Sequence, residues 1–121
     1  MNEIILSVKT VDEFFDEAIA SARRIDEGDL TPQTPRLSFH SLEDLYQTLD
    51  PFRWRLLDTL RRMGPSTRAE LSTALERGPA LLAKDLEKLL PIGLVEEDEA
   101  GLLSVPWAKI TTEVVFDRNA A

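Results

Sequence analysis

Between residues 50 and 105, closely spaced proline and glycine residues divide an apolar sequence into short segments. Asp50-Pro51 predicts the start of a helix, because aspartate caps free N–H groups and proline tolerates the first helical position. Gly64-Pro65 ends this helix, and the tight turn at Arg77-Gly78 separates a second helix from a third that begins at Pro79. Helices this short are unstable in isolation. The segment is therefore expected to fold around one shared core.

Each of these helices has apolar residues at helical spacing that can supply the core. In the first helix they are Phe52, Leu56, Leu57, Leu60 and Met63. In the second, whose start Ser66 and Glu70 flank, they are Ala69 or Leu71, with Ala74 and Leu75. In the third, which Pro91 stops, they are Leu82, Leu86, Leu89 and Leu90. Arg53 falls towards the core side of the first helix, so we expect it to pair with a carboxylate such as Asp85.

Two short strands are predicted after the third helix, at residues 94–97 and 102–105. The loop between them, Asp98 to Gly101, ends in glycine and is typical of a β-hairpin. Three short helices, a tight turn between the last two and then a hairpin are the order of a winged helix-turn-helix. The sequence therefore predicts an α+β protein with a three-helix core and a β-hairpin wing.

The amino-terminal part has a different pattern. Residues 4–8 predict a strand, and an apolar stripe over residues 11–25 predicts a helix that starts with a Thr10–Glu13 capping box and stops at Gly28. We expect three parts: a strand-helix extension over 1–28, an irregular linker over 29–40 and the winged helix-turn-helix domain over 41–121. The last part also includes a helix at about residues 42–49, with Ser41 and Asp44 at capping-box spacing, and a strand at 110–116. The two strands, 4–8 and 110–116, are expected to pair with each other or with another subunit.

Composition excludes several classes of site. The 121 residues contain no cysteine and one histidine, so disulfides, thiolate metal sites and multi-histidine sites are excluded. His40 lies in the linker without a candidate nucleophile, so we expect no enzymatic activity, catalytic residue, metal or cofactor. No apolar run is long enough to span a membrane, and Met1-Asn2-Glu3 lacks the basic start of a signal peptide. A cytoplasmic protein is therefore expected.

Residues 37–116 resemble a family of prokaryotic winged helix-turn-helix transcriptional regulators, some of which are regarded as antitoxin-like DNA-binding proteins. The matching stretches are Phe39 to Leu45, Leu49-Asp50-Pro51 with Arg53 and Leu56-Leu57, Ser66 to Leu71, Lys84-Asp85-Leu86, Ile92 to Val95 and Gly101 to Pro106. The resemblance covers about two thirds of the chain. It implies DNA binding, control of the protein's own operon and a toxin as protein partner.

Charge is unevenly distributed along the chain. Residues 51–93 carry eight basic and five acidic side chains, a net charge of +3 in a chain of net charge -8. In a winged helix-turn-helix the third helix enters the major groove of double-stranded DNA. Its outward positions are Ala80, Leu81, Ala83, Lys84, Glu87 and Lys88. The predicted DNA-binding residues are Arg68, Arg77, Lys84 and Lys88, which can lie along phosphates, with Ala80 and Leu81.

Two features favour an alternative function. Ala80, Leu81 and Ala83 offer no side chain for bidentate base readout, and the wing tip from Glu96 to Glu99 is acidic. The alternative is a winged-helix protein-interaction module that binds a basic partner, such as a toxin, and has lost sequence-specific DNA readout. In either case, the Phe-rich stripe of helix 11–25 is broader than a small core covers, so we expect a homodimer.

Overall fold

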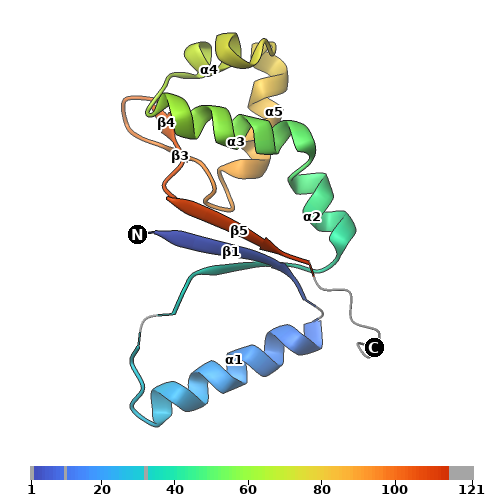
Figure 1. Ribbon diagram of the computed structural model, residues 1–121, viewed down its shortest axis with the longest axis vertical. Coiled ribbons are helices and arrows are strands. Elements are labelled where there is room, and N and C mark those ends of the chain that lie inside the picture. The colour runs from blue at the N-terminus through green and yellow to red at the C-terminus, as the bar shows by residue number, and fades with distance from the viewer. Residues whose placement is uncertain (1, 10, 32, 115–121) are drawn as a thin grey trace. The chain divides into compact units, whose positions relative to one another are not determined.

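The computed structural model describes residues 2–9, 11–31 and 33–114, and it has the expected α+β class (Figure 1). Five helices, a three-stranded sheet and a hairpin occur within these residues. The chain forms two compact units. One comprises residues 3–45 and the chain from 109 onward, and the other comprises residues 46–108 with Asn2. The sequence predicts domain boundaries at residues 28 and 40 instead, and it assigns the last strand to the larger domain.

The sheet of the first unit is parallel, and β1 (Glu3–Val8) is its central strand (Figure 1). β2 (Arg36–Phe39) and β5 (Lys109–Glu113) flank it, and Leu6 lies opposite Leu37 on one side and Thr112 on the other. Ile4 and Leu6 are buried, which explains why the most apolar strand is central. Pairing of the first and last strands within one chain is confirmed, and the predicted positions 115 and 116 lie outside the described residues.

β2 corrects the prediction of an irregular linker. The backbone N–H of Ile5 donates to the carbonyl of Pro35 at 3.0 Å, and that of Lys9 donates to the carbonyl of Phe39 at 2.8 Å. β1 would otherwise expose a row of unpaired backbone groups on this side, and a four-residue strand satisfies them. Pairing with a distant strand therefore overrides the turn-like composition that precedes it.

Helix α1 (Val11–Asp26) connects β1 to β2. Gly28 ends it as expected, with a φ of +88° and its N–H bonded to the carbonyl of Ile25 at 3.0 Å. The predicted cap, Thr10, lies outside the described residues. The apolar stripe of α1 is exposed rather than packed, and its large members are Phe14, Phe15, Ile19 and Ile25.

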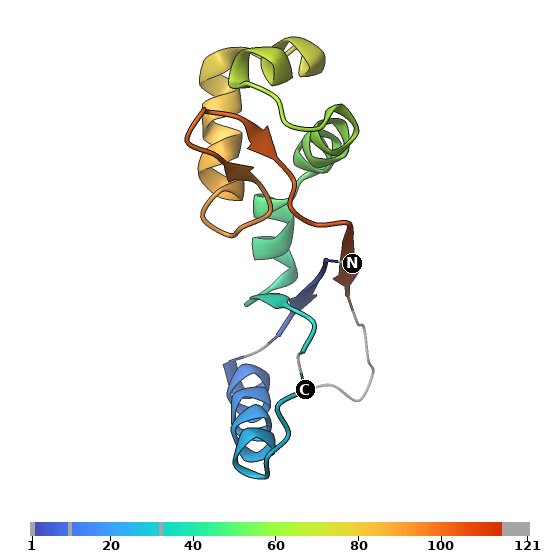
Figure 2. The ribbon, with the colours of Figure 1, turned by 90° about the vertical axis from the view of Figure 1, so that its left-hand side faces the viewer.

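The second unit contains the three predicted helices and the hairpin (Figure 2). They are α3 (Pro51–Met63), α4 (Arg68–Leu75), α5 (Pro79–Leu89), β3 (Glu96–Glu97) and β4 (Leu103–Ser104). Asp50 caps α3, since its side chain accepts from the backbone N–H of Arg53 at 2.8 Å. The shared core consists of Leu56, Leu57, Leu60, Leu71, Leu75, Leu82, Leu86, Leu89, Leu94, Val95 and Leu103. Helix α2 (Leu42–Thr48) precedes α3, and Ser41 accepts from the N–H of Asp44 at its start.

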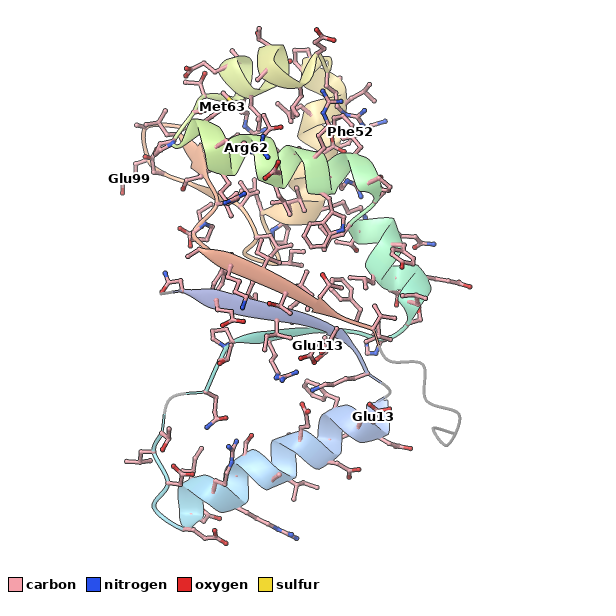
Figure 3. All side chains as sticks on the ribbon, in the orientation of Figure 1. Glu13, Phe52, Arg62, Met63, Glu99 and Glu113 are labelled. Carbon is pink, nitrogen blue, oxygen red and sulfur yellow. The ribbon has the colours of Figure 1, made fainter. Side chains whose placement is uncertain are left out.

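Several predicted core positions are not buried. Met63 is exposed at the end of α3 (Figure 3), and Ala69 and Ala74 are exposed on α4. The cap of α4 is Thr67, which forms a capping box with Glu70, rather than Ser66. On α4, the residues that are buried are Leu71 and Leu75, four positions apart on one face of the helix.

Ser66 has a different role from the one expected. Its backbone exchanges two hydrogen bonds with Leu103 of β4, at 2.7 and 3.0 Å. The connection between α3 and α4 thus forms a bridge to the hairpin, whose strands pair antiparallel with Glu97 opposite Leu103. The hairpin is thereby held to the three-helix core two residues before α4 begins.

Candidate nucleic-acid interface

The turn between α4 and α5 sets the direction of both helices. Glu76 has a left-handed backbone, with φ 52° and ψ 42°, and its N–H bonds back to the carbonyls of Ser72 and Thr73. Gly78 then caps α5 and Pro79 occupies its first turn. The chain therefore reverses within Glu76-Arg77-Gly78, in agreement with the expected tight turn (Figure 2).

The outward face of α5 brings four of the predicted residues together. Ala80, Leu81, Lys84 and Lys88 fall within about 100° of arc on a helical wheel and are all exposed. The opposite side carries the buried Leu82, Leu86 and Leu89. No carboxylate of the described residues lies within 4.0 Å of either lysine ammonium group, so both charges face solvent. We call Ala80, Leu81, Lys84 and Lys88 the α5 strip.

Arg68, at the first turn of α4, is engaged by the hairpin. Its Nε donates to Oε2 of Glu97 at 2.9 Å, and its Nη2 donates to Oε1 at 3.1 Å. This bidentate hydrogen bond lowers the pKa of the Glu97 carboxyl and raises that of the guanidinium. Arg68 is nevertheless 46% exposed, so solvent or a ligand can reach it. One of the four acidic residues of the hairpin is thus paired with a predicted DNA-binding residue.

Arg77 contacts core residues and is not part of an open basic surface. Its Nε donates to Oδ2 of Asp85 at 2.7 Å, and its guanidinium carbon lies 4.0 Å from the centroid of the Phe52 ring. The Asp85 side chain is 2% exposed, against 28% for Arg77. The sequence grouped Arg77 with Arg68, Lys84 and Lys88, but its charge is paired with the carboxylate of Asp85 on α5.

Asp85 is held by a second arginine as well. Nε of Arg53 donates to its Oδ1 at 3.1 Å, which confirms the predicted pairing. Nη1 of Arg53 also donates to the carbonyls of Gln47 and Thr48, at 2.7 and 3.2 Å. The Arg53–Asp85–Arg77 cluster therefore ties the end of α2, the start of α3 and the middle of α5 together. It fixes the helix that carries the α5 strip.

Other charged groups near the helices are paired or acidic. Asp58 bonds to both Arg61 and Arg62 on α3, and these bonds, Arg61 foremost, lower the pKa of its carboxyl. Asp98 accepts from the N–H of Leu102 at 2.8 Å and so closes the hairpin loop. Glu96 and Glu99 are exposed, with Glu99 at the edge of the hairpin (Figure 3). The hairpin therefore keeps exposed acidic side chains besides Glu97.

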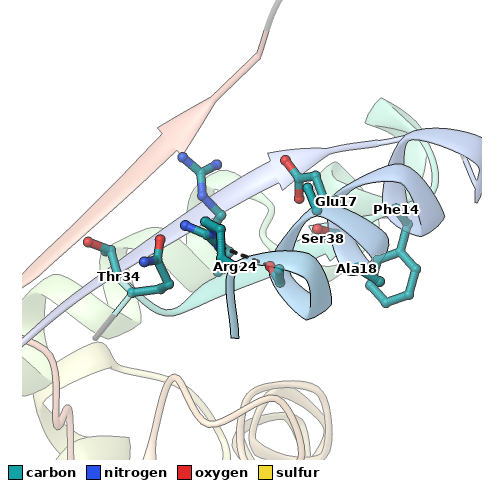
Figure 4. A pocket seen from close by; sticks show the side chains of 10 residues that line it. Phe14, Glu17, Ala18, Arg24, Thr34 and Ser38 are labelled. Atoms are coloured by element: carbon teal, nitrogen blue, oxygen red, sulfur yellow. Dashed lines mark hydrogen bonds between the residues drawn. The ribbon is translucent and has the colours of Figure 1, made fainter. Parts of the chain in front are cut away.

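The first unit has a shallow hollow that the sequence did not indicate. It measures about 460 Å³ and lies between α1 and the segment leading into β2, with Phe14, Glu17, Arg24, Thr34 and Ser38 among its lining residues (Figure 4). Nη2 of Arg24 donates to Oγ of Ser21 at 3.1 Å within it. Its residues come from a linker and an exposed helix face, so no motif in the sequence marks it.

The described residues contain no group of three or more histidine, aspartate or glutamate side chains that could hold a metal ion. They also contain no helix with the length and apolarity needed to cross a membrane.

Comparison with known proteins gave one match. The model of the HVO_A0114 family matches residues 48–112, more than half of the chain. This segment runs from the end of α2 through α3, α4, α5 and the hairpin into β5. No curated protein and no solved structure matches the chain.

Proposed function

This chain belongs to the HVO_A0114 family, and we propose that the segment it shares with that family is a winged helix-turn-helix that binds double-stranded DNA. The protein would act in the cytoplasm as a transcriptional regulator, with an antitoxin-like role as repressor of its own operon. The hairpin β3–β4 is the wing in this proposal, and α5 is the recognition helix.

The single observation that carries the proposal is the exposed α5 strip on a helix with a fixed orientation. A recognition helix must be supported from one side and open on the other. Leu82, Leu86 and Leu89 anchor α5 in the core, and the buried Asp85 is gripped by two arginines. Lys84 and Lys88 stand one turn apart on the open side, without a carboxylate partner among the described residues. α5 therefore has the support on one side and the exposed face on the other that entry into a DNA groove requires.

The chemistry of the strip favours contacts to the DNA backbone over base reading. Lysine ammonium groups at positions 84 and 88 suit phosphate oxygens or guanine acceptors. Ala80 and Leu81 can contact the methyl group of thymine, which is a weak form of sequence discrimination. Arg68 would add a third cationic contact when it exchanges the Glu97 carboxylate for a phosphate. We therefore propose binding with strong salt dependence and modest sequence preference.

The second candidate function is the protein-interaction module, and the acidic wing favours it. Glu96 and Glu99 are exposed, and they would repel phosphates but attract a basic protein such as a toxin. If the protein is an interaction module, Ala80 and Leu81 form a small apolar surface that contacts the partner. The two functions use surfaces of opposite charge: a cationic surface binds DNA, and an anionic surface binds the protein partner.

A mobility-shift titration with the DNA upstream of the protein's own gene tests the proposal. The Lys84→Glu/Lys88→Glu variant should lose the shift, because it reverses both charges of the strip. The matched control is Arg55→Glu/Arg62→Glu, which changes the net charge equally on exposed positions of α3. Equal loss in both variants would show that only total charge matters and would contradict a role for the strip. A wild-type protein that shifts no DNA would favour the interaction module.

A further inference from the structure

The hollow between α1 and the segment leading into β2 has a cationic end and an apolar end. α1 returns the chain from the end of β1 to the start of the parallel strand β2, so its last turns lie at the same end of the unit as the first residue of β2. Arg24 and Arg36 occupy these two positions, and both line the hollow. Phe14 lines it about 15 Å further back along the axis of α1, at the opposite end from Thr34 (Figure 4).

The charge of Arg24 is available to a ligand. Its Nη2 donates to Oγ of Ser21 at 3.1 Å, which uses one of the five N–H donors of a guanidinium group. Within the described residues, no carboxylate lies within 4.0 Å of this group. The neighbouring Arg23 is exposed on another side of the helix, about 100° away. α1 therefore directs one of its two arginines into the hollow.

The Arg36 side chain crosses the central strand of the sheet beside Ser7. Its Nη1 donates to Oε2 of Glu113 on β5 at 3.3 Å, and β1 lies between β2 and β5. Ser7 is in register with Ser38, which lines the hollow, and with Glu113, and side chains in register point to the same face of a sheet. Ser7 is 4% exposed, and its Oγ has no hydrogen-bond partner among the described residues. Such a buried hydroxyl group costs free energy, which a ligand oxygen would relieve.

We propose that this hollow binds a small organic phosphate, with the phosphate group between Arg24 and Arg36 and an apolar or aromatic group towards Phe14. Two guanidinium groups from opposite walls suit the three terminal oxygens of a phosphate, whereas one guanidinium group can hold a planar carboxylate alone. Arg36 exchanges the Glu113 carboxylate for the phosphate and uncovers the Ser7 hydroxyl, which then donates to the ligand. The volume of about 460 Å³ lies within the range of sites for small organic ligands.

The carboxylates near the hollow are compatible with an anionic ligand, because each has another partner or is solvated. Glu17, which lines the hollow, is paired with Lys9. Asp29, which follows α1, accepts from the N–H of Thr31 at 3.0 Å. Glu113 is 45% exposed, so water solvates it after Arg36 leaves.

This inference does not rest on DNA binding, because the residues that line the hollow lie outside the unit that carries the α5 strip. Ligand binding is measured without DNA, so failure of one proposal is distinguishable from failure of the other.

An NMR titration of the ¹⁵N-labelled full chain is the first test. The probes are hexyl phosphate and adenosine monophosphate, and at least one of them should shift the amide signals of Ser21, Arg24 and Ser38 to saturation. It should bind at least about tenfold more tightly than inorganic phosphate, since burial of two methylene groups suffices for that factor. The inference is overturned if neither probe saturates these signals, or if shifts are confined to Lys84 and Lys88. Heptanoate that binds as tightly as hexyl phosphate would contradict the choice of phosphate.

A pair of adjacent arginine variants tests the cationic end. Arg24→Gln should weaken binding of the phosphate probe at least about tenfold, because it removes charge-assisted hydrogen bonds from the hollow. Arg23→Gln is the matched control: it removes the same charge from the same helix at an exposed position, and it should bind like the wild type. Calorimetric titration measures both affinities, and circular dichroism confirms that α1 stays helical. Equal loss of affinity in both variants would show that only the charge of α1 matters.

Ser7→Ala separates ligand binding from folding. Loss of a hydroxyl group without a partner should not lower the free energy of unfolding of the ligand-free protein, which urea denaturation measures. The affinity for the phosphate probe should nevertheless fall several-fold, because the ligand loses a hydrogen bond. A variant that is less stable than the wild type but binds the probe equally well would contradict the role assigned to Ser7.

Discussion

At the scale of single residues, Asp85 is the polar group on which the three-helix core most depends. Its carboxylate is 2% exposed and is bonded to Nε of both Arg53 and Arg77. A buried carboxylate is tolerated only when its charge and lone pairs are satisfied. The sequence indicated the contact with Arg53, since both residues border apolar helix faces. It did not indicate the contact with Arg77. That residue reaches Asp85 across the turn between α4 and α5 and stacks on the Phe52 ring, and neither contact leaves a periodic pattern in the sequence.

Replacement of Asp85 should therefore be costly. In Asp85→Ala two guanidinium groups remain in a poorly solvated site without their carboxylate, and we expect a loss of about 3 kcal/mol in the free energy of unfolding. Urea denaturation measures this loss. The control, Asp58→Ala, removes a more exposed carboxylate that also bonds two arginines, and should lower the free energy of unfolding much less than Asp85→Ala does. Similar losses of unfolding free energy in both variants would contradict the importance assigned to the burial of Asp85.

The Arg68–Glu97 contact should compete with DNA. Glu97→Gln removes the charge that holds Arg68, so we expect tighter binding by several-fold, of the order of one additional phosphate contact. Glu99→Gln makes the same charge change on the hairpin, and within the described residues Arg68 bonds to Glu97 and not to Glu99. Fluorescence anisotropy with one duplex compares the two variants. Equal affinities would mean that Arg68 is no closer to DNA than the rest of the wing.

The same contact predicts a pH dependence. Hydrogen bonds from Arg68 lower the pKa of the Glu97 carboxyl below that of the unfolded chain. The ion pair therefore contributes stability at neutral pH, and this contribution is lost as the pH falls through the lowered pKa. Side-chain NMR titration should find the pKa of Glu97 below the ordinary value of a glutamate carboxyl, and Arg68→Gln should raise it towards that value. No change in Arg68→Gln would contradict the cause.

At the scale of elements, the helices of the second unit could be predicted closely and the edges of the sheet could not. Asp50-Pro51, Gly64 and Gly78-Pro79 are local signals that act through backbone geometry, so α3 and α5 begin where expected. β2 depends instead on pairing with β1, a contact that propensity does not encode. The α5 strip followed from helical periodicity, whereas the partners of Arg68 and Arg77 required the fold.

The start of α4 offers a test of local control. The Thr67 hydroxyl accepts from the N–H of Glu70 at 3.1 Å, and the Glu70 carboxylate accepts from the N–H of Thr67 at 3.1 Å. Thr67→Ala should lower the free energy of unfolding by about 1 kcal/mol, as loss of an N-cap does. Thr73→Ala, on the exposed side of the same helix, should not lower it. Thermal unfolding of both variants checks this, and equal melting temperatures would contradict the capping role.

At the scale of the whole molecule, the proposed function depends on a local surface whose charge opposes the net charge of the chain. The chain has a net charge of -8, yet the α5 strip carries two lysines without a carboxylate partner among the described residues. Phosphates approaching within about 10 Å respond mainly to the nearest charges, because salt screens the rest. Composition alone therefore could not decide between DNA and a basic protein as the partner, and the exposure of individual lysines is the informative quantity.

The most direct test of the central proposal is the salt dependence of DNA binding, compared between the wild type and Lys84→Gln/Lys88→Gln. Each lysine that neutralises a phosphate contributes about 0.9 to the slope of log K against log salt concentration. The proposal predicts that the double variant binds more weakly and has a slope smaller by about 1.8, that is, by two phosphate contacts. Binding with an unchanged slope would show that α5 does not face the DNA, and would contradict the proposal.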